Sequence, residues 1–217
     1  MTVEEDKPIG PRSSKGERTR GKLLQAAKEV FEENGFVEAR ISDIAERAEL
    51  SYGVFYHYFA SKDEIFREVA TYHEQQLGTA VLAEMEPVDG PADTVVAARL
   101  EAASRRYLVE YRDEVRLMAV IEQVSRYDAT LHEARMQRHM QYAERLAAAI
   151  IELQSHDLAD SAVDPTVGSQ LIMAMVTGFA EAWFVQSRVD CSFEEGVLQL
   201  NRLCLNALGL SRPAPGE

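Results

Sequence analysis

The spacing of apolar residues is the feature that most limits the fold of this 217-residue chain. Apolar side chains recur at intervals of three and four in almost every long segment, and no alternating β-branched run bounded by turn residues occurs. Such spacing gathers apolar side chains on one face of a helix, whereas in a strand it would scatter them over both faces. The sequence therefore predicts an all-α protein.

Capping residues, glycines and prolines divide these apolar segments from one another. We expect helices over residues 14–34, 41–48, 51–58, 61–85, 92–111, 113–127, 129–155, 165–188 and 193–208. Ser14 and Glu17 fit a capping box at the start of the first helix. The residues expected on its buried face are Leu23, Ala27, Val30 and Phe31. Gly35 can end this helix in a left-handed conformation, which lets Phe36 fold back onto Phe31.

Composition excludes several classes of protein. The 46% hydrophobic and 27% charged residues are typical of a globular chain, and no apolar run approaches the roughly 18 residues of a membrane span. Residues 1–16 contain no apolar segment that could act as a secretory signal, so we expect a cytoplasmic protein. Cys191 and Cys204 are expected to be reduced, buried thiols.

Charge is distributed unevenly along the chain. The net charge of −13 argues against nucleic acid, since binding to DNA is driven by neutralisation of phosphates. Residues 7–31, however, contain seven basic and two acidic side chains, and all five lysines lie at or before Lys62. This asymmetry indicates that the two ends have different partners, with DNA at the basic end.

Residues 41–59 read as two short helices joined by a tight turn. The apolar residues at spacings that bury the angle of a helix-turn-helix are Ile44, Ala48, Leu50, Phe55 and Tyr58. The opposite, polar and aromatic face of the second helix carries Tyr52, Gly53, Tyr56 and His57, which suits a recognition helix. Lys62 follows in the first turn of the next helix, where a cation is unfavourable. Its position therefore indicates an anionic partner such as a DNA phosphate.

The segments Ile41-Ser42-Asp43-Ile44-Ala45 and Ser51 to Glu64, with Ala26-Ala27, Phe31 and Asn34-Gly35-Phe36, resemble the DNA-binding signature of the tetracycline-repressor (TetR) family. The specific resemblance covers about residues 18–66. It implies a homodimeric transcriptional regulator, most often a repressor, whose C-terminal helices bind a small ligand and release a palindromic operator. The DNA-binding residues that we expect are Arg18, Arg20, Arg40, Ser42, Ser51, Tyr52, Gly53, Tyr56, His57 and Lys62.

Two positions depart from the family pattern. Arg40 stands where the family usually has a threonine that caps the second helix, so we expect Ser42 to take over the cap. Glu49 stands where the family usually has the glycine of the turn. A left-handed conformation there costs on the order of 1 kcal/mol, which the surrounding packing can tolerate.

We expect a flexible arm at residues 1–13, a DNA-binding domain at 14–62, an effector-binding and dimerisation domain at 63–210, and a flexible tail at 211–217. Small residues at intervals of four and an apolar stripe on the last helix indicate a dimer interface. The interface residues expected are Ala174, Gly178, Ala182, Val197, Leu200 and Cys204. Aromatic, methionine and polar residues of the C-terminal helices suit a ligand cavity. The cavity residues expected are Tyr107, Met118, Glu122, Gln123, His139, Met175, Phe179 and Trp183.

Other patterns give no sign of catalysis or metal binding. His132 and His139 share a helical face but have no third ligand at metal spacing, and Arg105 and Arg106 are expected to form surface ion pairs. No spacing joins a nucleophile to a base, so we expect no enzyme, no cofactor and no metal. The alternative to a regulator is a helical protein that binds a small molecule or a partner and whose helix-turn-helix is only structural.

Overall fold

The computed structural model describes residues 14–84 and 92–210. The predicted arm at 1–13, the proline and glycine break at 87–91 and the tail at 211–217 lie outside the described residues. Those described form helices joined by short turns, with no strand among them, so the all-α prediction is confirmed. None of the described helices is both long and apolar enough to cross a membrane.

The helices follow the predicted order. Their bounds are α1 (Ser14–Glu38), α2 (Ile41–Arg47), α3 (Tyr52–Tyr58), α4 (Lys62–Glu84), α5 (Ala92–Asp113), α6 (Val115–Ser125), α7 (Ala129–Ser155), α8 (Pro165–Ala180), a π-helical turn η1 (Glu181–Val185) and α9 (Phe193–Ala207). One difference is that the segment predicted as a single helix over 165–188 changes at Glu181 to the wider π-helical turn.

Side-chain caps explain where three of these helices begin. Asp128, Asp164 and Ser192 each precede a helix in extended backbone, and each side chain accepts a hydrogen bond from a backbone N–H of the first turn. These bonds satisfy N–H groups that have no partner inside the helix. Short polar residues therefore fix the starts of α7, α8 and α9.

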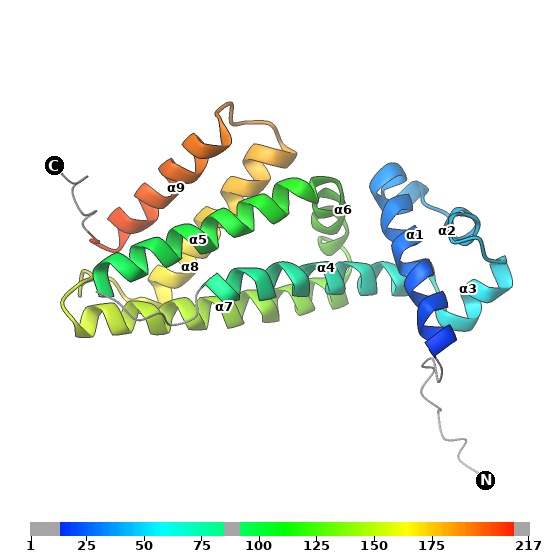
Figure 1. The fold of residues 1–217 in the computed structure, drawn as a ribbon, viewed down its shortest axis with the longest axis horizontal. Helices are drawn as coiled ribbons and strands as arrows, with labels where there is room; N and C mark the ends of the chain where they lie inside the picture. The colour runs from blue at the N-terminus through cyan, green and yellow to red at the C-terminus, as the bar shows by residue number, and fades with distance from the viewer. Residues whose placement is uncertain (1–13, 85–91, 211–217) are drawn as a thin grey trace, which may run out of the picture.

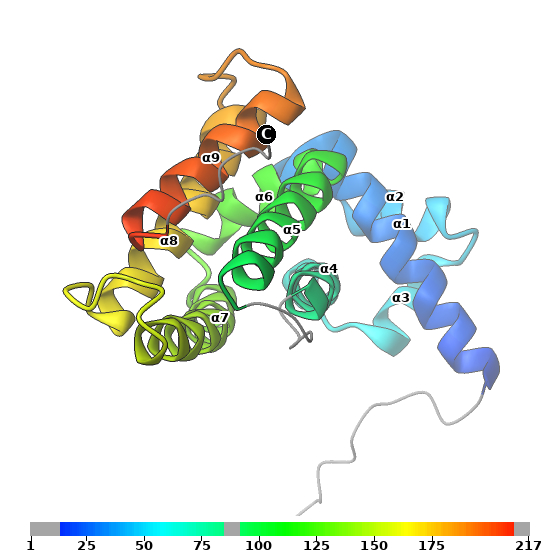
Figure 2. The same cartoon turned by 60° about the vertical axis from the view of Figure 1, so that its left-hand side comes forward.

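The molecule has two ends joined by α4 (Figure 1). Helices α1, α2 and α3 form a small unit at one end, and α5, α7, α8 and α9 form a larger bundle at the other. Figure 2 shows α4 end-on between the small unit and the bundle. Helix α4 therefore packs against both ends, through α1 on one side and through α5 and α7 on the other.

The small unit has its own aromatic core. Gly35 has a φ of 70°, and the chain beyond it brings the Phe36 ring to 5.9 Å from that of Phe31, as predicted. The Phe66 ring of α4 lies 4.9 Å from each of these two rings. The predicted buried face of α1 is also confirmed at Leu23, Ala27, Val30 and Phe31. These contacts seat α4 against α1.

Ion pairs link the small unit and α4 to the bundle. Lys28 Nζ of α1 lies 2.7 Å from Glu114 Oε2, directly before α6. Arg67 Nε of α4 lies 2.8 Å from Oδ2 of Asp128, which is also the cap of α7. The starts of α6 and α7 are thereby tied to α1 and α4.

Candidate functional site

The turn between α2 and α3 is closed by backbone hydrogen bonds. Leu50 N–H donates to Ala45 O at 2.9 Å and Glu49 N–H donates to Glu46 O at 2.9 Å, the pattern of a Schellman motif. Glu49 has a φ of 58°, so the expected left-handed conformation of a non-glycine residue is confirmed. This turn sets the angle between the two short helices.

Helix α3 is held from behind by its phenylalanines. Phe55 is fully buried and its ring lies 5.8 Å from that of Phe59, which is buried directly after the helix. The face of α3 opposite Phe55 therefore points away from this core. The predicted outward set, Tyr52, Gly53, Tyr56 and His57, is exposed throughout.

The two tyrosines of this face form a fixed pair. Tyr52 and Tyr56 are 54% and 47% exposed, their rings meet edge to face at 5.2 Å, and their hydroxyl oxygens are 3.1 Å apart. The hydrogen bond with Tyr52 raises the pKa of Tyr56. Next to them, Gly53 has open space where a side chain would begin, so its backbone is accessible. The pair presents a preset aromatic and hydroxyl surface to a partner.

The prediction that Ser42 caps α2 is wrong. The helix begins at Ile41, and Arg40 occupies the capping position without a side-chain cap. Arg40 O accepts from Asp43 N–H at 3.1 Å, while Ser42 Oγ donates to Asp43 Oδ1 at 3.0 Å. Arg40 and Ser42 are both exposed, as is Ser51, which precedes α3 and also makes no side-chain cap.

The reasoning that assigned an anionic partner to Lys62 is also wrong. Its ammonium donates to three backbone carbonyls at the end of α1, those of Phe36 at 2.6 Å, Val37 at 3.1 Å and Ala39 at 2.9 Å. The nitrogen also lies 4.6 Å from the centre of the Phe36 ring. A cation is favourable at the C-terminal end of a helix, so Lys62 has its partner within the chain.

The basic residues of α1 differ in how free they are. Arg20 of α1 forms an ion pair with Glu68 of α4 and lies over the ring of Phe59, which follows α3, at 5.2 Å. It therefore connects α1 with α4 and with the end of α3. Arg18 is exposed. Of the two, Arg18 is the one whose charge is presented to solvent.

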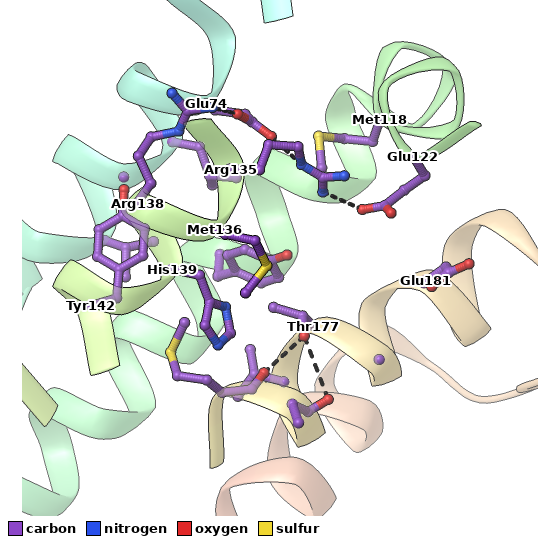
Figure 3. A pocket seen from close by; sticks show the side chains of 18 of the residues that line it. Glu74, Met118, Glu122, Arg135, Met136, Arg138, His139, Tyr142, Thr177 and Glu181 are labelled. Carbon is purple, nitrogen blue, oxygen red and sulfur yellow. Dashed lines mark hydrogen bonds and ion pairs between the residues drawn. The ribbon is translucent and has the colours of Figure 1, made fainter. Parts of the chain in front are cut away.

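A cavity of about 920 Å³ lies in the bundle, between α4, α5, α6, α7 and α8 (Figure 3). Four residues expected at a ligand site line it, namely Tyr107, Met118, Glu122 and His139. The expectation is wrong for Gln123, Met175, Phe179 and Trp183, which lie outside the lining. Trp183 is instead buried and stacks on Phe184 at 4.6 Å, within the aromatic core.

One wall of the cavity is a network of ion pairs. Arg135 Nε donates to Glu74 Oε1 at 2.6 Å, its Nη2 donates to Glu122 Oε1 at 2.5 Å, and its Nη1 donates to Ser125 Oγ at 2.8 Å. Arg138 bonds to the other oxygen of Glu74. Figure 3 shows Glu74 between the two arginines. The network joins α4, α6 and α7.

Burial shifts the protonation of this wall. Burial opposes the charge of Arg135, but the hydrogen bonds and charges of Glu122 and Glu74 outweigh it and raise the pKa of Arg135. Burial raises the pKa of Glu74, against the lowering effect of the two arginines. Burial also raises the pKa of Tyr107, so this cavity residue stays a neutral hydroxyl.

Several cavity residues have no distinguishing pattern in the sequence. Glu74 and Arg138 read as ordinary charges on amphipathic helices, and only their burial distinguishes them. Gly78 is needed because a Cβ there would lie 1.4 Å from the hydroxyl of Tyr142, whose ring rests against α4. A glycine inside a helix, facing another helix, is the one pattern that could have indicated this close approach.

The predicted dimer residues fall into two groups. Ala174 and Gly178 are exposed, and both also lie at the cavity, while Ala182 is half-buried. Val197, Leu200 and Cys204 are buried within the core of the subunit, so their assignment to an interface is wrong. Their stripe on α9 packs inward because α9 lies against α5 and α8.

The two adjacent arginines, Arg105 and Arg106, form surface ion pairs. Arg105 forms a bidentate pair with Glu194 at 2.8 Å and Arg106 pairs with Glu110 at 2.6 Å, as expected for surface ion pairs. Over residues 14–84 and 92–210, no three His, Cys, Asp or Glu side chains gather as they do around a metal ion.

Comparison with known proteins shows a likeness along most of the chain. The family model described as "Bacterial regulatory proteins, tetR family" matches residues 23–69. The HTH-type transcriptional regulator UidR of Escherichia coli (strain K12) is 25% identical over 186 residues, which cover 82% of this chain and 89% of that protein. The HTH-type transcriptional repressor NicS of Pseudomonas putida is 38% identical over 60 residues, 28% of each chain.

Solved structures share the whole fold. SmeT, the repressor of the Stenotrophomonas maltophilia multidrug efflux pump SmeDEF, superposes with a TM-score of 0.70 at 19% identity, over 90% of this chain and 94% of that one. At this identity the likeness shows the fold alone. The helix-turn-helix at one end and the helical bundle at the other are therefore an arrangement that other chains also adopt.

Proposed function

We propose, given that this chain belongs to the tetR family of bacterial regulatory proteins and is a DNA-binding transcriptional regulator, that it represses transcription as a homodimer on a palindromic operator. We propose further that a small, largely apolar effector, bound in the cavity of the bundle, releases the operator. The location that fits this role is the cytoplasm.

The outward face of α3 is the observation that carries the proposal. Tyr52, Gly53, Tyr56 and His57 stand exposed on a helix whose back is fixed by Phe55. A recognition helix needs a rigid support and exposed N-terminal side chains that reach base edges in the major groove. In this reading the tyrosine pair and the open backbone at Gly53 approach bases and phosphates, with Arg18, Arg40, Ser42 and Ser51 as neighbouring backbone contacts.

The homodimer is supported by the exposed surface of α8. Val167 and Leu171 are 57% and 65% exposed, and the small residues Ala174 and Gly178 continue the same exposed face. Exposed apolar residues that follow one helix are typical of an interface. Two copies paired there would present two α3 helices, and a palindromic operator places its half-sites about 34 Å apart.

Effector release is supported by the connection between the cavity and α1. Helices α4 and α6 line the cavity and also pack against α1. Glu74 and Glu122, on these two helices, share Arg135. A ligand that binds better to a different arrangement of α4 and α6 shifts the two α3 helices away from the spacing that fits DNA.

Repression is supported by the names of two of the similar proteins, while a third, FasR of Mycolicibacterium smegmatis, is named a transcriptional activator. NicS is named a transcriptional repressor, and SmeT is the repressor of an efflux pump. Bound at an operator, the dimer would block transcription until the effector lowers its affinity for DNA.

Selection of binding sites from random DNA, followed by affinity measurements with variants, tests the proposal. We expect a palindromic consensus, and we expect Tyr56→Ala and His57→Ala each to weaken binding by about ten-fold or more. Tyr72→Ala is the matched control, because Tyr72 is 63% exposed but lies on α4 outside the helix-turn-helix. Sedimentation should give a dimer for all of them. Unchanged affinity in both α3 variants would show that another surface binds DNA.

The alternative is a helical binding protein whose helix-turn-helix is only structural. In that case the selection would recover no consensus, while the cavity would still bind its ligand. The two functions are therefore separated by the DNA selection alone.

A further inference from the structure

The charged groups of the cavity are paired with one another. The lining includes three carboxylates and three guanidiniums, those of Glu74, Glu122, Glu181, Arg126, Arg135 and Arg138. Each lies within ion-pair distance of an opposite charge from the same set. Two histidines, His132 and His139, also line the cavity. Among the described residues, the carboxylates and the guanidiniums of the lining therefore balance one another.

Arg135 has little capacity left for an anionic ligand. Its Nε, Nη1 and Nη2 atoms donate to Glu74, Ser125 and Glu122, respectively, at 2.5 to 2.8 Å. Nη1 and Nη2 each keep one further N–H, but a carboxylate or phosphate that approached them would be repelled by the neighbouring Glu74 and Glu122. An anion at Arg138 would also be repelled by Glu74, which pairs with Arg138 and is mostly buried.

Glu74 is equally closed to a cationic ligand. One of its oxygens accepts from Arg135 and the other from Arg138, and the side chain is only 10% exposed. An ammonium group would meet two guanidiniums there. An ion of either sign would lose its hydration on entry, and this loss is costly unless a free opposite charge compensates for it.

Neutral polar groups and apolar side chains form the rest of the lining. Tyr107, His139 and Thr177 bring a hydroxyl, an imidazole and a second hydroxyl to the cavity, and Figure 3 shows His139 and Thr177 on neighbouring helices. The apolar part of the lining comprises Leu77, Met118, Leu146, Ile172, Met173 and Val176. Methionines adapt their shape to a ligand. Thr177 Oγ1 already donates to Met173 O at 2.9 Å, and His139 Nε2 pairs with Gln170 Oε1 at 3.1 Å. The Tyr107 hydroxyl can donate to an uncharged ligand oxygen, and the Thr177 oxygen can still accept from a ligand hydroxyl.

We propose that the effector is an uncharged amphipathic molecule, with a hydrocarbon body and a hydroxyl or carbonyl group, and that the paired wall of Glu74, Glu122, Arg135 and Arg138 excludes anionic and cationic relatives of that molecule. This inference rests on the proposed effector function and names the class of ligand for the same cavity. The wall acts as a specificity filter, because only a neutral ligand leaves its ion pairs intact.

Three probes with one hydrocarbon chain test the inference. Titration calorimetry on the DNA-free protein compares dodecan-1-ol, dodecanoate and dodecylammonium, each below its aggregation concentration. We expect the alcohol to bind at least about ten-fold more tightly than either ion. Equal or tighter binding of either ion, or no binding of any probe, would overturn the inference.

Substitutions at Glu122 and Arg135 test whether these residues determine the preference for a neutral ligand. Glu122→Gln removes one of the two carboxylates that hold Arg135, so the ratio of alcohol affinity to dodecanoate affinity should fall by about ten-fold. Arg135→Gln should likewise lower the ratio of alcohol affinity to dodecylammonium affinity by about ten-fold. Glu133→Gln, an exposed change outside the lining, is the control and should alter neither ratio. Unaltered ratios in both wall variants, with circular dichroism showing that they fold, would overturn the filter.

Operator release separates this inference from the proposed function. If dodecanoate binds best and releases operator DNA, the effector function stands and the ligand class is wrong. If the alcohol binds best and leaves operator affinity unchanged, the ligand class stands and the effector function is wrong.

Discussion

Replacement of Lys62 by methionine should destabilise the DNA-binding unit even when DNA is absent. The ammonium of Lys62 donates to the carbonyls of Phe36, Val37 and Ala39 at 2.6 to 3.1 Å and so closes the end of α1. Methionine keeps a stem of similar length but removes the charge and all three donors. The carbonyls at the end of α1 then lose their common partner.

The size of this effect follows from the contacts. Hydrogen bonds to a charged group contribute about 1.5–3 kcal/mol net, and the site is only partly buried, so we take the lower half of that range. The ammonium also lies over the Phe36 ring, an interaction of about 0.5–1 kcal/mol that a methionine sulfur partly replaces. We expect Lys62→Met to lower the free energy of unfolding by about 2 kcal/mol.

Urea unfolding followed by circular dichroism, at one protein concentration, measures this change. Lys22→Met is the matched control, because Lys22 is an exposed lysine of α1, and it should change stability by less than about 0.5 kcal/mol. If Lys62→Met leaves stability unchanged but reduces the salt dependence of DNA binding by about one phosphate contact, Lys62 serves DNA rather than the end of α1.

Three further variants test other parts of the structure. Glu49→Gly should raise the free energy of unfolding by about 1 kcal/mol in urea titration, because Glu49 holds a φ of 58° that glycine adopts without strain; a loss of stability would contradict this. Gly78→Ala should weaken binding of dodecan-1-ol in calorimetry, because its Cβ would collide with the Tyr142 hydroxyl and force that ring to move; unchanged binding would show that the ring yields elsewhere. Burial lowers the pKa of His73 below 6.5, so the unfolded state binds the proton first as the pH falls and stability is lost below about pH 6.5. In His73→Gln this loss should be smaller, as shown by unfolding at about pH 7 and about pH 5, and an equal loss in both proteins would place the titrating group elsewhere.

The helix-turn-helix could be predicted from the sequence because its determinants are local. Phe55 is buried, while Tyr52 and Tyr56, four residues apart and therefore on one face of a helix, are exposed on another side of α3. The left-handed turn at Glu49 is what the resemblance to the TetR family implies, because that family usually has a glycine at this position. Such features depend on a few neighbouring residues.

The cavity and the interface depend on which helices meet, and helical periodicity does not state that. The stripe of Val197, Leu200 and Cys204 shows that one face of α9 is buried, but burial inside the subunit and burial against a second copy require the same residues. The prediction that Trp183 lines the cavity is wrong for a similar reason. Its ring fills the space left by Gly196, where a Cβ would approach it to 2.2 Å, a contact between distant segments.

Lys62 shows a limit of electrostatic reasoning from sequence. A cation in the first turn of a helix is unfavourable for that helix alone, yet the side chain crosses to the C-terminal end of α1, 23 or more residues away. Only the packing of α4 against α1 reveals that partner.

The salt dependence of DNA affinity tests the central claim, that this chain binds operator DNA through the end of the molecule that carries α3. With a selected palindromic site, we expect the logarithm of the association constant to fall linearly with the logarithm of salt concentration. A dimer with about six phosphate contacts predicts a slope of about −5. A flat profile, or no binding at low salt, would contradict the claim.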